Sequence, residues 1–258
     1  MPRPRSEQEG PDGGMQVITR AAAILGALAE PDGGHSLARL AQRTGLPKTT
    51  VHRICTALEQ VGYVHTDPRT GRRELGPSLL RLAVVGRRDL IAVLQPAMER
   101  LSVELNETVD LGVLDGGDVL FVAQHTAPER ALMAIARVGV KLPAYTLASG
   151  KALLAQLPRE EILRRLPRRM EPTLDGRPRT REGLLRELDE VEASGLAFER
   201  EELRHGVCAV AVAIRDVDGR AASVAVPMPA SRFAESEEKV AARLLELRDT
   251  IEARLRGA

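Results

Sequence analysis

The chain has 258 residues, of which 43% are hydrophobic and 2% aromatic, and its 37 Lys and Arg residues nearly balance 36 Asp and Glu residues. This length predicts two domains, and the net charge of +1 gives by itself no sign of nucleic-acid or membrane binding. The two cysteines show no CxxC or Cys/His pattern, no apolar run is long enough to span a membrane, and the first residues lack the apolar core of a signal peptide. We therefore expect a cytoplasmic protein with reduced cysteines and no membrane association.

The first domain is predicted over residues 15–76, after a polar, Pro- and Gly-containing arm over residues 1–14 that we expect to be disordered. A first helix is expected at about 17–29. Ser36 is a plausible N-cap for a second, short helix that ends near Thr44 and Gly45, and Pro47 suits the first turn of a third helix. The 3.6-residue period places one apolar face of the third helix at Val51, Ile54, Cys55, Leu58 and Val61.

After the third helix, the sequence GYVHTDPRTGRREL predicts two strands around a turn built on Pro, Thr and Gly. Three helices with a sharp bend between the second and third, followed by a hairpin, are typical of a winged helix-turn-helix domain. The opposite face of the third helix is polar and basic, and basic residues also cluster at the hairpin. The residues expected to contact double-stranded DNA are Ser36, Lys48, Thr49, Thr50, His52, Arg53, Thr56, Arg69, Arg72 and Arg73.

The distribution of charge supports this interpretation. Between His35 and Arg73 there are seven basic and two acidic residues, whereas residues 77–258 hold 27 basic and 28 acidic residues. An ordinary pair of amphipathic helices with solvated arginines would explain any one of these features. Helix spacing, small residues at the bend, a basic helix face and a basic hairpin occur together here, and their combination favours DNA binding.

Residues 77–89 are predicted to form a linker helix, and residues 90–258 a second domain. This domain begins with an amphipathic helix at about 90–105, followed by two apolar strands around Asp115-Gly116-Gly117-Asp118, a strong hairpin signal. The later expected elements are a strand near 132–136, helices at about 149–157, 159–166 and 180–194, strands at about 196–199, 207–215 and 221–226, and a closing helix at about 235–256. Hairpins mixed with helices indicate an α+β domain with a mainly antiparallel sheet.

Three separated segments resemble the IclR family of transcriptional regulators. The segment LARLAQRTGLPKTTVHRICTALEQVGYVHTDPRTGRRELG resembles the family's winged helix-turn-helix, and VGVKLPAYTLASGKALLA and GLAFEREELRHGVCAVAVAIRDVDGR resemble two motifs of its C-terminal domain. The resemblance implies a DNA-binding domain joined by a helix to a GAF-like domain that binds a small-molecule effector. It also implies a homodimer or homotetramer. From the two-domain layout we expect the effector to change the separation of the two recognition helices and hence operator affinity, and we expect no cofactor.

The resemblance also implies where the effector binds. The expected lining residues are Leu132, Met133, Ala148, Ser149, Gly150, Glu199, Ala209, Ala225 and Pro227. The family usually has Cys where this chain has Ala209, often Asp in place of Glu199, and hydroxyl residues at the positions of Ala225 and Pro227. A lining poor in hydroxyl groups favours a largely apolar organic acid or an aromatic metabolite. The alternative is that these positions are only core and that the ligand touches other residues.

Two other functions remain open at this point. The second domain would only oligomerise in a constitutive DNA-binding regulator. An enzyme is disfavoured, because the one candidate pair, Cys208 with His205, is more often coincidence, and the five histidines show no paired metal-ligand spacing. Gly150-Lys151 does not make a nucleotide-binding loop, since Tyr145 stands where that motif has its first Gly and Ala152 where it has Ser or Thr.

Overall fold

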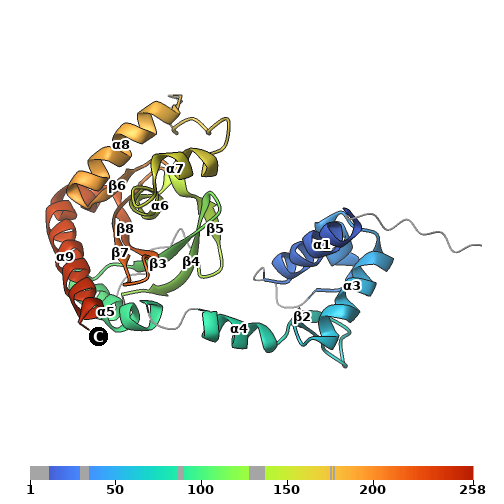
Figure 1. The fold of residues 1–258 in the computed structure, drawn as a ribbon. Helices are drawn as coiled ribbons and strands as arrows, with labels where there is room; N and C mark the ends of the chain where they lie inside the picture. Colours follow the sequence, from blue (N-terminus) through green and yellow to red (C-terminus); the bar gives the residue numbers. More distant parts are fainter. Residues whose placement is uncertain are drawn as a thin grey trace, which may run out of the picture. The chain divides into compact units, whose positions relative to one another are not determined.

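A computed structural model describes residues 12–29, 35–86, 90–127, 137–174, 176 and 178–257. The chain divides into two compact units, Met1–Arg87 and Arg88–Ala258 (Figure 1). Each unit has its own hydrophobic core. Residues 1–11 of the predicted arm, the strand expected at 132–136, and with it Leu132 and Met133, lie outside the described residues.

Three helices form most of the first unit, as predicted: α1 (Asp12–Leu28), α2 (Leu37–Thr44) and α3 (Lys48–Gln60). The Ser36 hydroxyl accepts a hydrogen bond from the backbone N–H of Arg39 at 3.3 Å, and Gly45 ends α2 in the left-handed region with φ 66°. The predicted arm is too long, because α1 begins at Asp12. Two glycines near the start of a helix cost only about 1 kcal/mol each, which the following helical residues outweigh.

The core of this unit lies where the three helices meet. It is built from apolar residues of α1, α2, α3 and the first strand, among them Ile24, Leu40, Val51, Ile54, Cys55 and Val64. Val61 was expected on the same face and does not belong to it, since its side chain is 54% exposed. The helix ends at Gln60, so the 3.6-residue period no longer applies to Val61.

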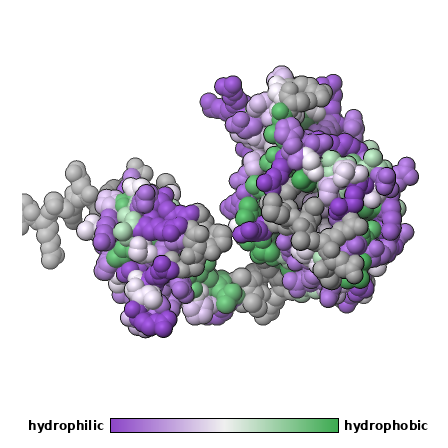
Figure 2. Space-filling view, turned by 180° about the vertical axis from the view of Figure 1, so that it is seen from behind, coloured by the Kyte–Doolittle hydropathy of each residue, from purple (hydrophilic) through white to green (hydrophobic). Residues whose placement is uncertain are grey.

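A short antiparallel hairpin, β1 (Val64–Thr66) and β2 (Arg73–Leu75), follows α3 and confirms the predicted wing. Next comes α4 (Ser78–Gly86), the expected linker helix, which belongs to the first unit. Leu80 and Leu82 of this helix are exposed, and Figure 2 shows hydrophobic surface at the α4 end of a unit whose visible face is otherwise largely hydrophilic.

The second unit is built on a six-stranded sheet in the order β5-β4-β3-β8-β7-β6, with every described pair of neighbours antiparallel. The strands are β3 (Val109–Asp115), β4 (Asp118–His125), β5 (Lys141–Pro143), β6 (Ala197–Arg200), β7 (Val207–Arg215) and β8 (Ala221–Pro229). The predicted α+β class with an antiparallel sheet is confirmed. The sequence did not indicate β5, which has three residues and, among the described strands, pairs only with β4.

Helices cover both faces of this sheet (Figure 1). On one face lie α6 (Ala148–Leu154), α7 (Arg159–Arg165) and α8 (Arg181–Ser194), and on the other lie α5 (Leu90–Leu105) and α9 (Ala230–Arg256). Successive side chains of β7 point to opposite faces of the sheet and so pack into both cores. Ala209 faces α6 and Cys208 faces α9. No helix in the described part of the chain is long and apolar enough to cross a membrane.

Candidate functional site

The outer face of α3 is the strongest candidate for a DNA contact. Five of its predicted residues are exposed: Lys48, Thr49, His52, Arg53 and Thr56. Thr50 is half-buried, while the apolar face of the same helix is held against α1 and α2. The Thr56 hydroxyl donates to the carbonyl of His52 at 3.0 Å, so its oxygen remains as an acceptor. Donors and acceptors on one exposed helix face match what base edges in a major groove require.

The wing is held in shape by Asp67. Its carboxylate accepts hydrogen bonds from the backbone N–H groups of Arg69 and Thr70 at 2.8 and 3.3 Å and from the Thr70 hydroxyl at 2.8 Å. The Thr70 hydroxyl and these backbone N–H groups keep the pKa of Asp67 below its usual value. The turn thus places the side chains of Arg69 and Arg72 on an exposed tip, where they can reach phosphates.

Arg73 lies in different surroundings from Arg69 and Arg72. Its backbone exchanges two hydrogen bonds with His35, at 2.8 and 2.9 Å, which join β2 to the residue before Ser36. Its guanidinium is half-buried and donates to the carbonyl of Gly71 at 3.0 Å. Arg73 was predicted as a DNA contact; its backbone joins the wing to His35, and the contact of its side chain with DNA stays a prediction.

In the second unit, a cavity of about 30 Å³ lies between the start of α6 and the sheet. Six of the predicted effector residues line it, namely Ala148, Ser149, Glu199, Ala209, Ala225 and Pro227, together with Asp110, Phe121, Leu142 and Leu147. Strand register explains the grouping, since Glu199 pairs with Ala209 and Ala209 with Pro227 across three strands.

Gly150 is the predicted effector residue that the structure places elsewhere. It does not line this cavity. A Cβ atom there would overlap the carbonyl oxygen of Ala144, in the turn Ala144–Thr146 that precedes α6. Gly150 therefore allows close packing between this turn and the helix. Ser149 lies inside the first turn of α6, whose N-cap is Leu147.

Two buried carboxyl groups face the cavity, and the sequence indicated only one of them. Burial raises the pKa of Asp110 to about 7, against a hydrogen bond of 2.6 Å from the Gln124 amide. Burial likewise raises the pKa of Glu199 to about 7, opposed by the backbone N–H groups of Glu202 and Leu203. Asp110 was missed, although a single polar residue in the apolar run VDLGV was a usable signal.

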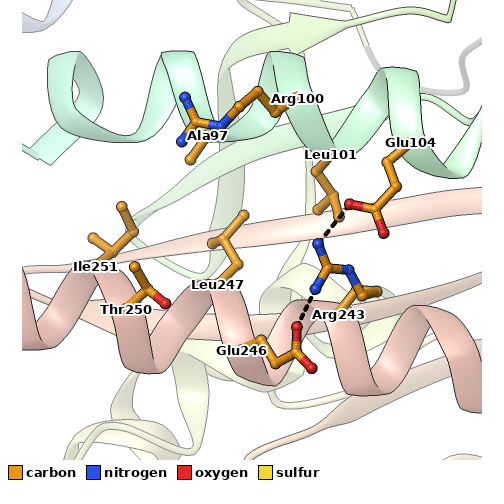
Figure 3. Close-up of a pocket in the computed structure, with 9 residues that line it drawn as sticks. All are labelled: Ala97, Arg100, Leu101, Glu104, Arg243, Glu246, Leu247, Thr250 and Ile251. Atoms are coloured by element: carbon orange, nitrogen blue, oxygen red, sulfur yellow. Dashed lines mark hydrogen bonds and ion pairs between the residues drawn. The ribbon is translucent and has the colours of Figure 1, made fainter.

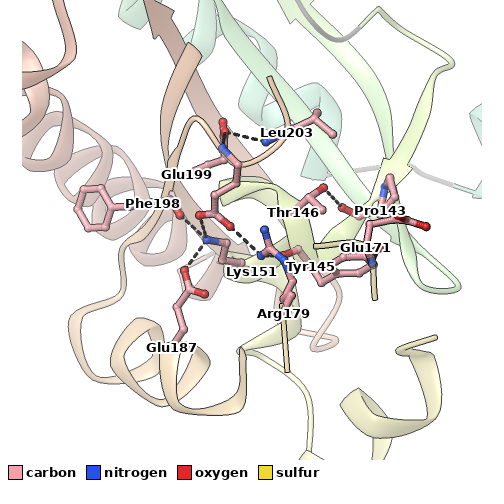
Figure 4. A network of polar contacts seen from close by, with 11 residues as sticks. Pro143, Tyr145, Thr146, Lys151, Glu171, Arg179, Glu187, Phe198, Glu199 and Leu203 are labelled. Carbon is pink, nitrogen blue, oxygen red and sulfur yellow. Dashed lines mark hydrogen bonds and ion pairs between the residues drawn. The ribbon is translucent and has the colours of Figure 1, made fainter. Parts of the chain in front are cut away.

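A buried lysine next to the cavity joins α6 to neighbouring elements (Figure 4). Lys151 of α6 is fully buried, and its ammonium group donates to the carbonyl of Phe198 at 2.8 Å, to Glu202 at 2.5 Å and to Glu187. Glu202 also pairs with Arg179 at 2.7 Å. These contacts fix α6 relative to β6 and α8, and so fix the first turn of α6 that lines the cavity.

A second cavity, of about 170 Å³, lies on the other side of the sheet between α5 and α9 (Figure 3). Arg243 spans it, bonding to Glu104 at 2.5 Å and to Glu246. The hydrogen bond from Arg243 lowers the pKa of Glu104. Arg243 is already paired with Glu104 and Glu246 within the protein. This cavity therefore offers a ligand fewer unpaired polar groups than the cavity beneath α6 does.

The thiol of Cys208 is not placed for nucleophilic chemistry. Cys208 is buried in the core beneath α5 and α9, and burial raises the pKa of its thiol. His205 is exposed, with its Nδ1 3.9 Å from a carboxylate oxygen of Glu201. Among the described residues, no group of three His, Cys, Asp or Glu side chains is arranged to hold a metal ion.

Residues 17–68 match the family described as the IclR helix-turn-helix domain, and residues 82–253 match the Bacterial transcriptional regulator IclR C-terminal family. The chain belongs to the IclR family of transcriptional regulators. This IclR-family protein is 40% identical to the HTH-type transcriptional regulator Rv1719 of Mycobacterium tuberculosis over 97% of this chain and 96% of the relative. It is 30% identical to the transcriptional repressor IclR of Escherichia coli over 86% and 83% of the two chains.

Solved structures agree with this assignment. An IclR homologue from Microbacterium hydrocarbonoxydans, crystallised in complex with 4-hydroxybenzoate, superimposes with a TM-score of 0.77 at 28% identity and covers 94% of this chain and 100% of its own. The two curated relatives named above are transcriptional regulators.

Proposed function

We propose that this IclR-family protein is a ligand-responsive regulator in which α3 enters the major groove of operator DNA and an effector in the cavity beneath α6 alters operator affinity. The observation that carries the DNA-binding proposal is the division of α3. Val51, Ile54 and Cys55 are buried, while Arg53 and its polar neighbours are exposed. A helix held only by its apolar side leaves its other side available to a partner.

Arg53 is proposed as a base contact and Arg72 as a phosphate contact. Arg53 lies in the middle of the exposed face of α3, where a guanidinium can pair with O6 and N7 of guanine. Arg72 belongs to the wing, which Asp67 holds as a compact turn beside the helices. Phosphates are the same in every sequence, so a contact from Arg72 would strengthen binding without selecting a site.

The test is to replace each arginine by Ala in the full-length chain and to measure DNA affinity by fluorescence anisotropy on sites selected from a random pool. Loss of Arg53 is expected to cost about 1 to 3 kcal/mol and to relax specificity at one base pair. Loss of Arg72 should weaken binding to all sequences and reduce the slope of log Kd against log salt by about 1. Equal behaviour of the two variants would contradict the division into base and phosphate contacts.

For the effector, we propose an aromatic or largely apolar molecule that carries a hydroxyl or another hydrogen-bond donor. Phe121, Leu142 and Leu147 supply apolar contacts, and the carboxyl groups of Asp110 and Glu199 can accept a donated hydrogen bond. A carboxylate on the effector would be repelled by the carboxylate forms of Asp110 and Glu199. An acid therefore fits this cavity only if its own carboxylate lies away from these two groups. The homologue bound to 4-hydroxybenzoate supports the choice of a hydroxylated aromatic ring.

The effector proposal is tested by the rise in melting temperature on adding phenol, 4-hydroxybenzoate, benzoate or a short aliphatic acid. A ligand bound to the folded state raises the melting temperature in proportion to occupancy. Hydroxylated rings should give the largest rise, and Glu199→Gln should reduce it, whereas Glu190→Gln on the exposed side of α8 should not. If no compound in a broad library raises the melting temperature and DNA binding persists, the constitutive alternative holds.

We also propose that the protein works in the cytoplasm as a homodimer or homotetramer, since helix-turn-helix regulators usually read paired half-sites. Light scattering of the free protein and of its operator complex distinguishes these states. A monomer bound to a single half-site would contradict the proposal.

A further inference from the structure

We propose that the second unit contains a separate binding site for the phosphate group of a small phosphorylated metabolite, in the segment between α7 and α8. A cavity of about 360 Å³ opens there. Its lining residues are Arg168, Arg169, Met170, Pro172, Gly176, Pro178, Arg179, Thr180 and Arg181. None of them lines the cavity beneath α6, so this cavity, which we call the arginine cavity, is separate from the proposed effector site.

The charge of the arginine cavity is the first reason for the proposal. Four of its described lining residues are arginines, and none of them is acidic. Arg168 and Arg169 are exposed and form no hydrogen bond or ion pair with any residue that the structure describes. Like charges gathered around one cavity repel one another, and a bound anion relieves that repulsion.

The second reason is a set of buried guanidinium donors. The side chain of Arg179 is only 7% exposed, and its Nη1 is fixed by Glu202 at 2.7 Å and by the carbonyl of Tyr145 at 2.8 Å (Figure 4). Within the described part of the chain, its Nε and Nη2 have no acceptor, and neither does Nε of Arg181. Buried donors without acceptors are uncommon in proteins, and a phosphate group that reached these two guanidinium groups would supply the missing acceptors.

Surrounding contacts hold these donors in place. Arg181 donates from Nη2 to the carbonyls of Leu166 and Pro167, at 3.1 and 2.9 Å, which ties the end of α7 to the start of α8. Arg179 also lies over the ring of Tyr145, 5.6 Å from its centroid. The guanidinium groups of Arg179 and Arg181 are thus positioned before any ligand arrives, which lowers the entropy lost on binding.

A phosphate monoester fits this site better than a free carboxylate. Guanidinium groups bind phosphate oxygens through paired hydrogen bonds, and a phosphate brings up to two negative charges to a site with several positive ones. The cavity is larger than one phosphate group needs. Its apolar residues Met170, Pro172 and Pro178 can contact the organic part of the ligand.

The experiment is calorimetric titration of the full-length chain, without DNA, with glucose 6-phosphate, inorganic phosphate, citrate and glucose. The test variant is Arg168→Gln/Arg169→Gln, and the control is Arg186→Gln/Arg204→Gln, which removes two exposed positive charges that do not line the cavity. We expect one glucose 6-phosphate per chain, tighter than inorganic phosphate and citrate, and no binding of glucose. The test variant should bind at least about 10-fold more weakly, and the control should change by less than about twofold.

Three outcomes would overturn the proposal. One is no heat of binding from either phosphate compound at millimolar concentration. Another is equal affinity for citrate and glucose 6-phosphate, which would indicate unspecific attraction of anions. The third is equal weakening in the test and control variants. Because the titration contains no DNA and its variants lie outside the cavity beneath α6, it does not depend on whether the proposed operator and effector contacts are correct.

Discussion

Replacing Lys151 by Met should destabilise the second unit by about 3 kcal/mol, because a buried ion pair that loses one partner typically costs about 3 to 5 kcal/mol. The lysine is fully buried, and its ammonium group serves Glu187, Glu202 and the carbonyl of Phe198. Without it, that carbonyl loses its donor, which alone costs roughly 1 to 3 kcal/mol. Glu202 keeps Arg179 as a partner and Glu187 is partly exposed, so we expect the lower end of the range.

Amide hydrogen exchange in β7 measures this change, since the central strands of a sheet exchange through global opening of the unit. A loss of about 3 kcal/mol corresponds to roughly 100-fold faster exchange. The matched control is Lys141→Met, because Lys141 pairs with Asp115 while the two side chains are 49% and 50% exposed. That exposed pair should contribute less than about 1 kcal/mol. Equal loss in both variants, or a loss below about 1 kcal/mol in Lys151→Met, would refute the reasoning.

Two further predictions concern Asp110 and Gly150. Asp110 has its pKa raised from 3.8 to about 7 in the folded protein, so its contribution to stability is lost as pH rises between these values. Asp110→Asn should therefore be more stable than the native chain by about 2 kcal/mol at pH 8, and by much less near pH 4, in urea unfolding; an unchanged pH profile would contradict the shift. Gly150→Ala should destabilise the second unit by about 1 to 3 kcal/mol through overlap with Ala144. In α1, Gly26→Ala meets no atom within 4 Å and should stabilise the first unit by about 0.5 to 1 kcal/mol. Melting curves of both variants test this pair, and a stabilised Gly150→Ala would contradict it.

The sequence predicted the first unit well because its signals are local. The Ser36 cap, the left-handed Gly45 and the apolar period of α3 each depend on residues within one or two helical turns. The errors lie at element ends, where local signals are weak. Examples are the start of α1 at Asp12 and the exposure of Val61 just beyond α3.

In the second unit, the sequence predicted the fold class and most elements, but the site only in part. Ala209 and Pro227 could be assigned to the cavity only through family resemblance, because nothing in their own chemistry indicates a ligand. The position of Asp110 in the cavity depends on the strand register, which brings it beside Ala225, more than one hundred residues away along the chain. Gly150 was expected in the cavity but does not line it. Its neighbour in space is the turn at Ala144, and spacing along α6 carries no information about that contact.

The cavity beneath α6 measures about 30 Å³, far less than the roughly 360 Å³ of the arginine cavity, so its walls leave little free space in the described conformation. We therefore expect an aromatic effector to select a rarer, wider conformation. Its apparent dissociation constant then equals the intrinsic constant divided by the fraction of molecules that are already open. Replacing Leu142 by Ala would consequently tighten binding, although it removes a contact, if the free energy gained from the larger open fraction exceeds the apolar contact energy that is lost.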